Sequence, residues 1–200
     1  NDWYVRHARR RLQELASQGA NLESAATRLR AIFDSHPDST RKLRALWCLA
    51  SINALSDQWL MRQLHHPDEH VRLWAVQFLA QSSADPATVA ASLTSMATDE
   101  PSPLVRLYLA SALQKLPASL RWGVATELVK HTQDAHDHAQ PLMIWYGIEP
   151  AVTLNPSKAL GLDKSTTFPI VRRHVSRLLA SQIDSSPEYI TQLLLTASES

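Results

Sequence analysis

The sequence predicts an all-α protein, folded as an α-α superhelix (solenoid) of about six helix pairs. Three observations lead to this prediction. Glycine is scarce, with four residues in 200, and no segment alternates β-branched residues as a strand would. Most segments place apolar residues at i, i+3, i+4, i+7 and i+8, the period of an amphipathic helix. A Val-Arg pair also recurs at multiples of about 33 residues.

Prolines mark the starts of several predicted helices. Asp85, Ser102, Asn155 and Ser186 each precede a proline. Their side chains can cap a helix, and proline fits the first helical position because the N–H it lacks would be unpaired there. In chain order, the expected helical segments are residues 1–12, 21–33, 42–50, 57–64, 68–80, 85–97, 101–113, 118–129, 139–148, 155–162, 171–179 and 186–197.

The Val-Arg pairs identify the second helix of each pair. They begin at Val5, Val71, Val105 and Val171, at spacings of 66 (5 to 71), 34 (71 to 105) and 66 (105 to 171) residues. The two longer spacings should each hide a degenerate copy. Leu43-Arg44 fits the first of these copies, and a copy with Ala139 in the valine position fits the second. Helix pairs of this size cannot bury their apolar faces alone, so stacking must complete the core.

The recurring arginines are expected to form a ladder along the stacked units. The ladder consists of Arg6, Arg44, Arg72, Arg106 and Arg172. One interpretation is a strip that binds anions, with Arg72 and Arg106 as candidate binding residues. The favoured interpretation is structural, because Asp68 lies four residues before Arg72 and Asp2 four before Arg6, where an acid can cap the helix and hold the arginine.

The segment "PLMIWYGIEP", residues 141–150, departs from the other copies. With Ala139 as the reference position, the core stripe contains Leu142, Met143, Tyr146 and Gly147. Trp145 then occupies a position that is polar in three copies and should face water, and Gly147 should leave a gap where other copies pack leucine. An exposed large aromatic is typical of a contact surface. The candidate binding residues here are Trp145, Tyr146 and Glu149.

Composition excludes several classes of partner and site. Twenty basic and nineteen acidic side chains leave a net charge of +1, which does not indicate nucleic acid binding. No apolar run approaches the roughly 20 residues of a membrane span, so no membrane insertion of this segment is expected. Cys48 is the single cysteine, which excludes an intrachain disulfide, a cysteine-rich zinc site and a C-x-x-C-H haem attachment. It is expected to be a small buried residue.

Residues 131–138 contain side chains of the metal-ligand type, but their spacing matches no closed site. Weak candidates are His131, Asp134, Asp137 and His138, and we assign no metal. Acids that precede a helix are usually caps. No carboxylate pair, phosphate-binding loop or Ser-His-Asp set appears at a recognisable spacing, so no catalytic residue is predicted. Two hypotheses follow: a non-catalytic scaffold for protein or inter-domain contacts, or a segment that completes an enzyme or metal site through the His131–His138 loop and Glu149.

The period and the Asp…Val-Arg signature resemble HEAT repeats. More specifically, "NDWYVRHARRRLQE", "HHPDEHVRLWA", "SPLVRLYLASALQKLP", the H-x-x-DA-x-D motif of residues 131–137 and "PLMIWYGIEP" resemble the helical-repeat segment of the large haem-binding C-x-x-C-H proteins of planctomycetes, often named membrane-bound dehydrogenases. The block from DA-x-D to WYGIEP is the more specific part of this resemblance. The resemblance implies a β-propeller before this segment and a cytochrome c-type domain after it. It also implies haem c elsewhere in the parent, no cofactor in this chain, and export of the parent. We therefore expect residues 1–200 to be a single HEAT-like domain from a larger oxidoreductase.

Overall fold

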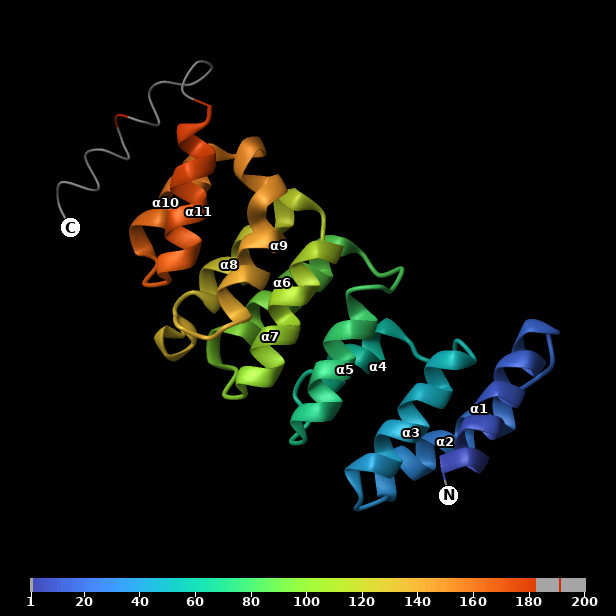
Figure 1. Cartoon of the computed structure of the whole chain (residues 1–200). Helices are drawn as coiled ribbons and strands as arrows, with labels where there is room; N and C mark the ends of the chain where they lie inside the picture. Colours follow the sequence, from blue (N-terminus) through green and yellow to red (C-terminus); the bar gives the residue numbers. More distant parts are fainter. Residues whose placement is uncertain (1, 183–190, 192–200) are drawn as a thin grey trace. The chain divides into compact units, whose positions relative to one another are not determined.

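The computed structural model describes residues 2–182 and residue 191, and it confirms the all-α class (Figure 1). Within those residues, regular structure consists of eleven α-helices and three short 3-10 helices, and no strand is present. The helix predicted at 186–197, with its cap Ser186, lies outside the described residues. The remaining predicted helices are all found, which confirms that the apolar period of the sequence is helical.

The chain divides into two compact units, Asn1–Leu79 (unit 1) and Ala80–Ser200 (unit 2). Unit 1 contains α1 (Asp2–Ser17), α2 (Glu23–Ser35), α3 (Ser39–Ser51), α4 (Asp57–Gln63) and α5 (Glu69–Leu79). Unit 2 contains α6 (Pro86–Asp99), α7 (Pro103–Ala112), η1 (Leu113–Lys115), η2 (Ala118–Leu120), α8 (Arg121–Leu128), η3 (Thr132–Asp134), α9 (Gln140–Leu154), α10 (Pro156–Ser165) and α11 (Pro169–Ala180). A single domain over residues 1–200 stays a prediction.

Each unit stacks helix pairs in the manner expected of a helical repeat. In unit 1, α2 packs on α3 and α4 on α5, while α3 contacts both α1 and α5. In unit 2, α7, α9 and α11 follow one another in one layer, and α6 packs against α8 in the other. The Val-Arg helices and their degenerate copies are thus the second members of the pairs, as the repeat predicts, and within each unit they contact one another in succession.

The predicted helix caps form hydrogen bonds where the described residues include them. Asp85 accepts from the N–H of Thr88, Ser102 from Val105, and Asn155 from Lys158. All three precede a proline that begins the helix, so each cap satisfies one N–H that the first turn would leave unpaired.

Helices α1 and α3 of unit 1 end in the same way. Gly19 follows α1 with a φ of 75°, and Asn53 follows α3 with a φ of 54°. After α3, the N–H of Ala54 donates to Leu49 O at 2.9 Å, and the N–H of Asn53 donates to Ala50 O at 3.1 Å. These are the two bonds of a Schellman turn, which glycine and asparagine tolerate because they adopt the left-handed conformation more readily than other residues.

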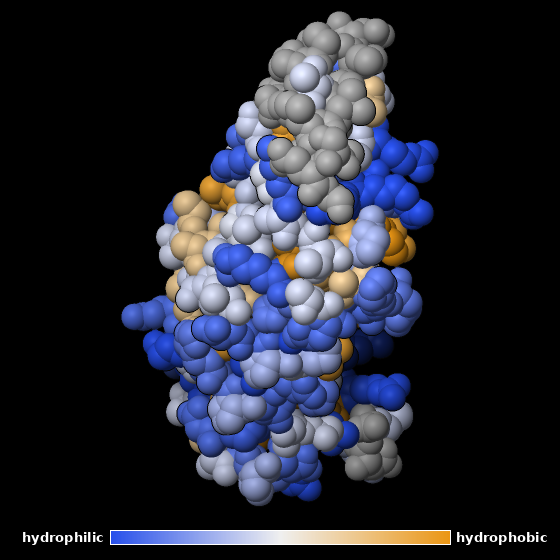
Figure 2. All heavy atoms as spheres, turned by 90° about the vertical axis from the view of Figure 1, so that its left-hand side faces the viewer, coloured by the Kyte–Doolittle hydropathy of each residue, from blue (hydrophilic) through white to orange (hydrophobic). Residues whose placement is uncertain are grey.

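The cores lie between the two layers of each unit. In unit 1, Phe33, Ala45, Leu46 and Val71 form one buried cluster against which Trp59 and other partly buried side chains pack. Cys48 is also buried, as predicted. Figure 2 shows a face on which hydrophilic residues predominate and hydrophobic ones form small separate areas. Among the described residues, no helix combines the length and the apolar character needed to cross a membrane.

Candidate functional site

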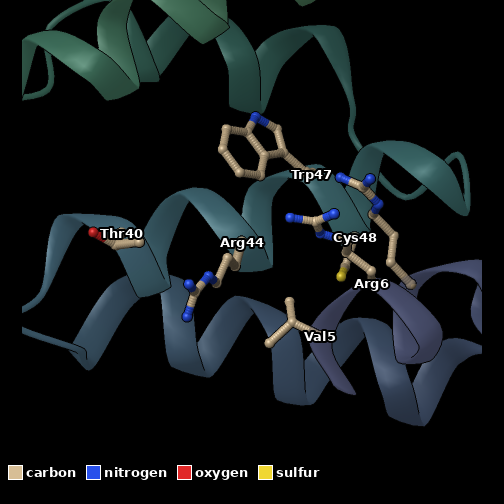
Figure 3. A pocket seen from close by; sticks show the side chains of 7 residues that line it. Val5, Arg6, Thr40, Arg44, Trp47 and Cys48 are labelled. Carbon is tan, nitrogen blue, oxygen red and sulfur yellow. The ribbon is translucent and has the colours of Figure 1, made fainter. Parts of the chain in front are cut away.

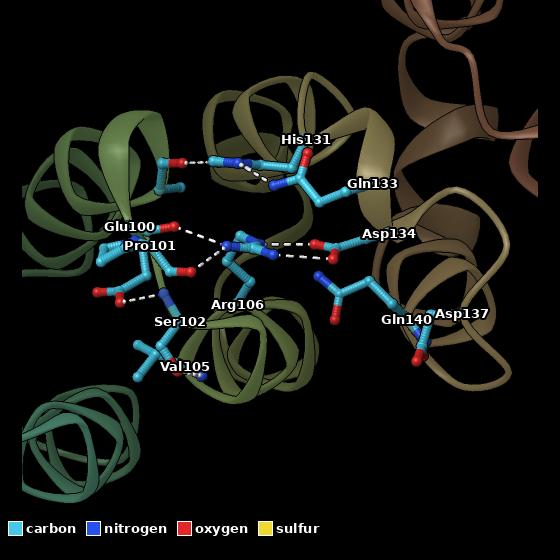
Figure 4. Close-up of polar contacts among 11 residues, drawn as sticks. Glu100, Pro101, Ser102, Val105, Arg106, His131, Gln133, Asp134, Asp137 and Gln140 are labelled. Atoms are coloured by element: carbon cyan, nitrogen blue, oxygen red, sulfur yellow. Dashed lines mark hydrogen bonds and ion pairs between the residues drawn. The ribbon is translucent and has the colours of Figure 1, made fainter.

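Arg106 is the predicted binding residue with the most completely defined environment. Its side chain is 2% exposed, and Nε and Nη2 donate to the two carboxylate oxygens of Asp134 at 2.6 and 2.8 Å. Nη1 donates to the backbone oxygens of Glu100 and Pro101 at 2.8 and 2.9 Å (Figure 4). Because these donors are engaged inside the protein, Arg106 holds α7 to the loops before α7 and α9 rather than offering an anion site.

Two other arginines of the series make the same kind of backbone contact. Arg72 Nη1 donates to the backbone oxygens of His66 and Pro67, both at 3.0 Å, in the loop before α5. Arg172 donates to two backbone oxygens in the segment before α11. These contacts favour the structural interpretation of Arg72, Arg106 and Arg172 over an anion-binding strip.

The residues that cap the second helices fix the register of the repeat. Each accepts the backbone N–H of a residue two or three positions further on, and successive caps are 30 (38 to 68), 34 (68 to 102) and 35 (102 to 137) residues apart. The four caps are Asp38, Asp68, Ser102 and Asp137. In α5 and α7 the structural arginine lies four residues after the cap, so the cap identifies the equivalent residue in the other helices.

In α3 this rule leads to Lys42 rather than Arg44. Lys42 Nζ donates to the backbone oxygens of Phe33 and Asp34 at 2.6 and 3.2 Å, as Arg72 does in the next pair. The prediction that Arg44 fills the arginine position of α3 is therefore wrong. The Val-Arg pattern gave the wrong residue because α3 carries its structural cation as Lys42, two residues before Arg44.

In α9 the same rule shifts the predicted register by one residue. Asp137 accepts from the N–H groups of Ala139 and Gln140 at 2.8 and 2.7 Å, and these bonds lower the pKa of its carboxyl group. Gln140, not Ala139, is three residues after this cap and corresponds to Val105 of α7. Pro141 then stands in the arginine position, so the Val-Arg signature is absent from this copy.

The shift explains why the predicted exposure of Trp145 is wrong. In the corrected register Trp145 corresponds to Ala110 of α7, which is buried. Trp145 is 6% exposed, and its ring stacks on His174 of α11 with the centroids 5.1 Å apart and the planes 18° apart. The tryptophan therefore packs at the α9–α11 contact and does not present a free surface.

Gly147 leaves no gap, which corrects a second expectation for this segment. A Cβ atom added at Gly147 would lie 2.6 Å from Cβ of Leu113. The space is thus already filled by Leu113, at the start of η1. Glycine allows this close approach of α9, because any larger residue would displace the leucine.

Pro150 lies inside α9 and has no N–H to donate to the carbonyl of Tyr146. One residue further along, Arg121 Nη1 donates to the oxygen of Gly147 at 2.7 Å, and Arg121 Nε donates to Leu116 O at 2.8 Å. Burial lowers the pKa of Arg121. Arg121 thus ties the start of α8 to the middle of α9, a role that no sequence pattern indicated.

Tyr146 and Glu149 are the predicted contact residues of α9 that do reach the surface. Tyr146 is 53% exposed, so its assignment to the buried stripe is wrong for the same one-residue reason. Glu149 is exposed as predicted. Their role as binding residues stays a prediction.

The residues of the His131–His138 loop mainly serve internal contacts. His131 Nε2 lies 2.7 Å from Ala97 O, and Asp134 is 6% exposed and bound to Arg106. Asp137 caps α9, and the exposed His138 lies 3.6 Å from it. In the part of the chain that the structure describes, no three His, Cys, Asp or Glu side chains are placed to hold a metal ion.

Unit 1 contains a surface feature of which the sequence patterns indicated only Arg6 and Arg44, as members of the arginine series; we call it the arginine–tryptophan groove. It is lined by Arg6 and Arg9 of α1, by Arg44 and Trp47 of α3, and by Trp74 and Phe78 of α5. Two adjoining hollows of about 290 and 510 Å³ form it, and Arg9 and Trp47 line both. The groove therefore has an arginine-rich end and an aromatic end.

The arginine-rich end lies between α1 and α3 (Figure 3). Arg6 and Arg9 are exposed, and among the side chains that the structure describes, which do not include that of Asp2, no carboxylate forms an ion pair with either of them. Their neighbours Arg10 and Arg11, in contrast, both bind Glu14. The two groove arginines are one helical turn apart, so both project from the same face of α1.

The aromatic end is built from rings in edge contact. Trp47 and Trp74 have centroids 5.3 Å apart with planes at 74°, and Trp74 and Phe78 have centroids 5.5 Å apart. All three rings are only partly buried. Partly exposed tryptophan and phenylalanine beside arginine are residue types that are enriched in the centres of protein interfaces.

A comparison with known families supports a repeat architecture for part of the chain. Residues 26–114 match the family model of HEAT repeats. No curated protein and no solved structure matches the chain significantly. The matched residues run from α2 to the end of α7 and η1, where the cap spacing is also regular. The chain therefore contains a HEAT-repeat segment at residues 26–114.

Proposed function

We propose that the chain is a non-catalytic helical-repeat scaffold that binds another protein or a neighbouring domain. The main support is the HEAT-repeat segment, because HEAT repeats are generally scaffolds for protein interactions. In unit 2, the polar side chains that could bind a ligand or a metal include Arg106 and His131, and both have structural partners. Arg106 binds Asp134, and His131 contacts a backbone oxygen. The arginine–tryptophan groove of unit 1 is, in contrast, open to a partner.

Selection of random displayed peptides on the immobilised chain tests this proposal. We expect enrichment of related sequences whose soluble forms compete with the displayed ones. The control is the same chain unfolded in denaturant, which should enrich nothing in common with the folded chain. Absence of enrichment, or stoichiometric zinc, iron or calcium in the purified chain, would contradict a purely scaffolding role.

We also propose that this scaffold lies within a haem-binding C-x-x-C-H protein of the dehydrogenase type. The support is the sequence resemblance of residues 1–14, 65–75, 102–117 and 141–150 to that family. In that setting the segment would hold a propeller domain and a cytochrome domain in place. The reading frame on both sides of these residues tests the proposal. We expect a propeller domain encoded before them and a C-x-x-C-H motif after them. The absence of both would refute the proposal.

A further inference from the structure

We propose that the arginine–tryptophan groove binds an acidic peptide segment of a partner protein, with carboxylates at the arginine end and an aromatic or large aliphatic side chain at the tryptophan end. The inference rests on the proposed scaffold function and adds where and what the scaffold binds. It follows from the charge, the exposure and the shape of residues in unit 1.

Charge complementarity indicates the acidic half of the ligand. Arg6 and Arg9 line one hollow together with Arg44, which already has an interaction partner of its own, and the residues that line it include no carboxylate. A guanidinium group presents a planar set of donors that matches a carboxylate in two parallel hydrogen bonds. Arg6 and Arg9 have side chains on one face of α1 about 5–6 Å apart at Cβ, so they can hold two acids of one extended peptide.

The aromatic end indicates the other half. The second hollow, of about 510 Å³, is lined by Trp47, Trp74 and Phe78. Its volume falls in the range of pockets that accept apolar groups. Arg9 and Trp47 line both hollows, so a ligand that occupies both must place its apolar group directly beside its acidic groups.

A peptide fits these features better than a nucleic acid. Nucleic acid binding relies on an extended positive surface along the phosphate backbone, whereas this chain has a net charge of +1 and the groove carries three arginines at one end. Acidic side chains next to an apolar one supply partners for both ends.

The first experiment measures binding of a fluorescein-labelled peptide of about twelve residues by fluorescence anisotropy. The probe carries glutamates at two alternate positions, followed closely by a phenylalanine and a leucine. Two control peptides replace the glutamates with glutamine, or the phenylalanine and leucine with alanine. We expect the complete chain to bind the probe, with an affinity that falls as the salt concentration rises. Each control peptide should bind at least about tenfold more weakly than the probe.

Matched variants on one helix locate the site. Arg6→Gln with Arg9→Gln should weaken probe binding at least about tenfold. The control, Arg10→Gln with Arg11→Gln, removes the same charge from the same helix but outside the groove, and should change affinity less than about twofold. All four arginines are exposed, so both variants should fold. Equal weakening by the two variants would overturn the proposal, since it would show a diffuse charge effect.

Cys48 supplies an independent readout because it lines the arginine end and is the single thiol of the chain. Bound probe should slow its alkylation in the native chain but not in the Arg6→Gln, Arg9→Gln variant. A single-stranded oligonucleotide of equal charge should compete poorly, and stronger competition than the unlabelled peptide would overturn the proposal in favour of nucleic acid.

The outcomes separate this inference from the scaffold proposal. If selected peptides bind the chain but depend on Tyr146 or Glu149 instead of Arg6 and Arg9, the scaffold proposal stands and the groove inference fails. If the acidic probe binds with the expected dependence on Arg6 and Arg9, both stand. If neither the probe nor any selected peptide binds, both fail.

Discussion

The two units use arginine in opposite ways. In unit 2, Arg106 is almost completely withdrawn from water, and its donors are taken up by Asp134 and two backbone oxygens. In unit 1, Arg6 and Arg9 are exposed and lack an ion-pair partner among the side chains described, that of Asp2 not being one of them. A buried guanidinium must be paired because its desolvation is unfavourable, whereas an exposed one remains available to a ligand. Burial, rather than residue type, therefore separates the internally paired Arg106 from the exposed Arg6 and Arg9.

The two tryptophan-containing surfaces differ in the same way. Trp145 of unit 2 is covered by His174 of α11, so its ring area stabilises the stack of helices. Trp47 and Trp74 of unit 1 contact each other and still line an open hollow. A substitution in unit 2 should therefore change stability, and a substitution in the groove should change binding.

The largest expected effect is on the buried ion pair. Arg106→Met should lower the free energy of unfolding by about 3–5 kcal/mol, because it leaves the Asp134 carboxylate buried without its partner. Denaturant unfolding followed by circular dichroism measures the change. Arg6→Met is the matched control on the exposed side of the comparison, and should change stability by less than about 0.5 kcal/mol.

A double variant sharpens this result. Arg106→Met combined with Asp134→Leu should be more stable than the sum of the two single losses predicts, by about 0.5–3 kcal/mol of coupling. Strict additivity of the two losses would show that the pair does not act as a unit, and would remove the contrast between the two kinds of arginine.

The second effect concerns Trp145. Trp145→Ala should lower the free energy of unfolding by about 3 kcal/mol, since it empties a packed aromatic site at the α9–α11 contact. Under conditions where the variant stays folded, its binding of the acidic peptide probe should be unchanged. Nearly unchanged stability together with weaker peptide binding would instead make Trp145 a contact residue, as its sequence position first indicated.

The helix positions were predictable because they depend on local patterns. Apolar periodicity and the pairs Asp85-Pro86, Ser102-Pro103 and Asn155-Pro156 locate helices with no knowledge of tertiary contacts. The register of α9 was misjudged because Pro141 replaces the arginine of the Val-Arg pair. Counting from the cap Asp137 would have recovered it, since the cap side chain is a local signal that survives this replacement.

The long-range features could not be obtained in this way. Arg106 and Asp134 are 28 residues apart, and their pairing depends on how the loop before α9 packs against α7. The arginine–tryptophan groove combines side chains from α1, α3 and α5, so it exists only once these helices stack. Periodicity assigns each of these residues to a helix face, but it does not say which faces a neighbouring pair will cover.

A third and smaller effect compares two glycines of unit 2. Gly147→Ala should lower the free energy of unfolding by about 1–3 kcal/mol, because its Cβ would lie 2.6 Å from Cβ of Leu113. Gly161→Ala in α10 meets nothing within 4 Å and should raise stability by about 0.5–1 kcal/mol. Thermal unfolding of both variants measures the difference, and opposite signs are expected. A neutral Gly147→Ala would show that Leu113 can move aside.

The smallest effect is on pH dependence and again compares the units. His66 of unit 1 accepts the N–H of Asp68 through Nδ1, and burial together with the charge of Lys42 lowers its pKa. Burial and nearby arginines lower the pKa of His174 in unit 2. Since the folded pKa lies below the unfolded value of about 6.5, stability is complete above that pH and is lost as pH falls through it toward the folded pKa.

The variant His66→Asn separates the contribution of unit 1. An asparagine oxygen can accept the same N–H two residues on and does not titrate in this range, so the variant should retain stability at neutral pH and lose less of it on acidification. His65→Asn, at the adjacent exposed position, is the control for the histidine-to-asparagine change itself. Unfolding free energies measured between about pH 7.5 and 5 test both variants. Partial burial lowers both pKa values. If the unfolding free energy of His66→Asn depended on pH in the same way as that of the original chain, His66 would be more open to water than its contacts indicate. The acid sensitivity would then arise in unit 2.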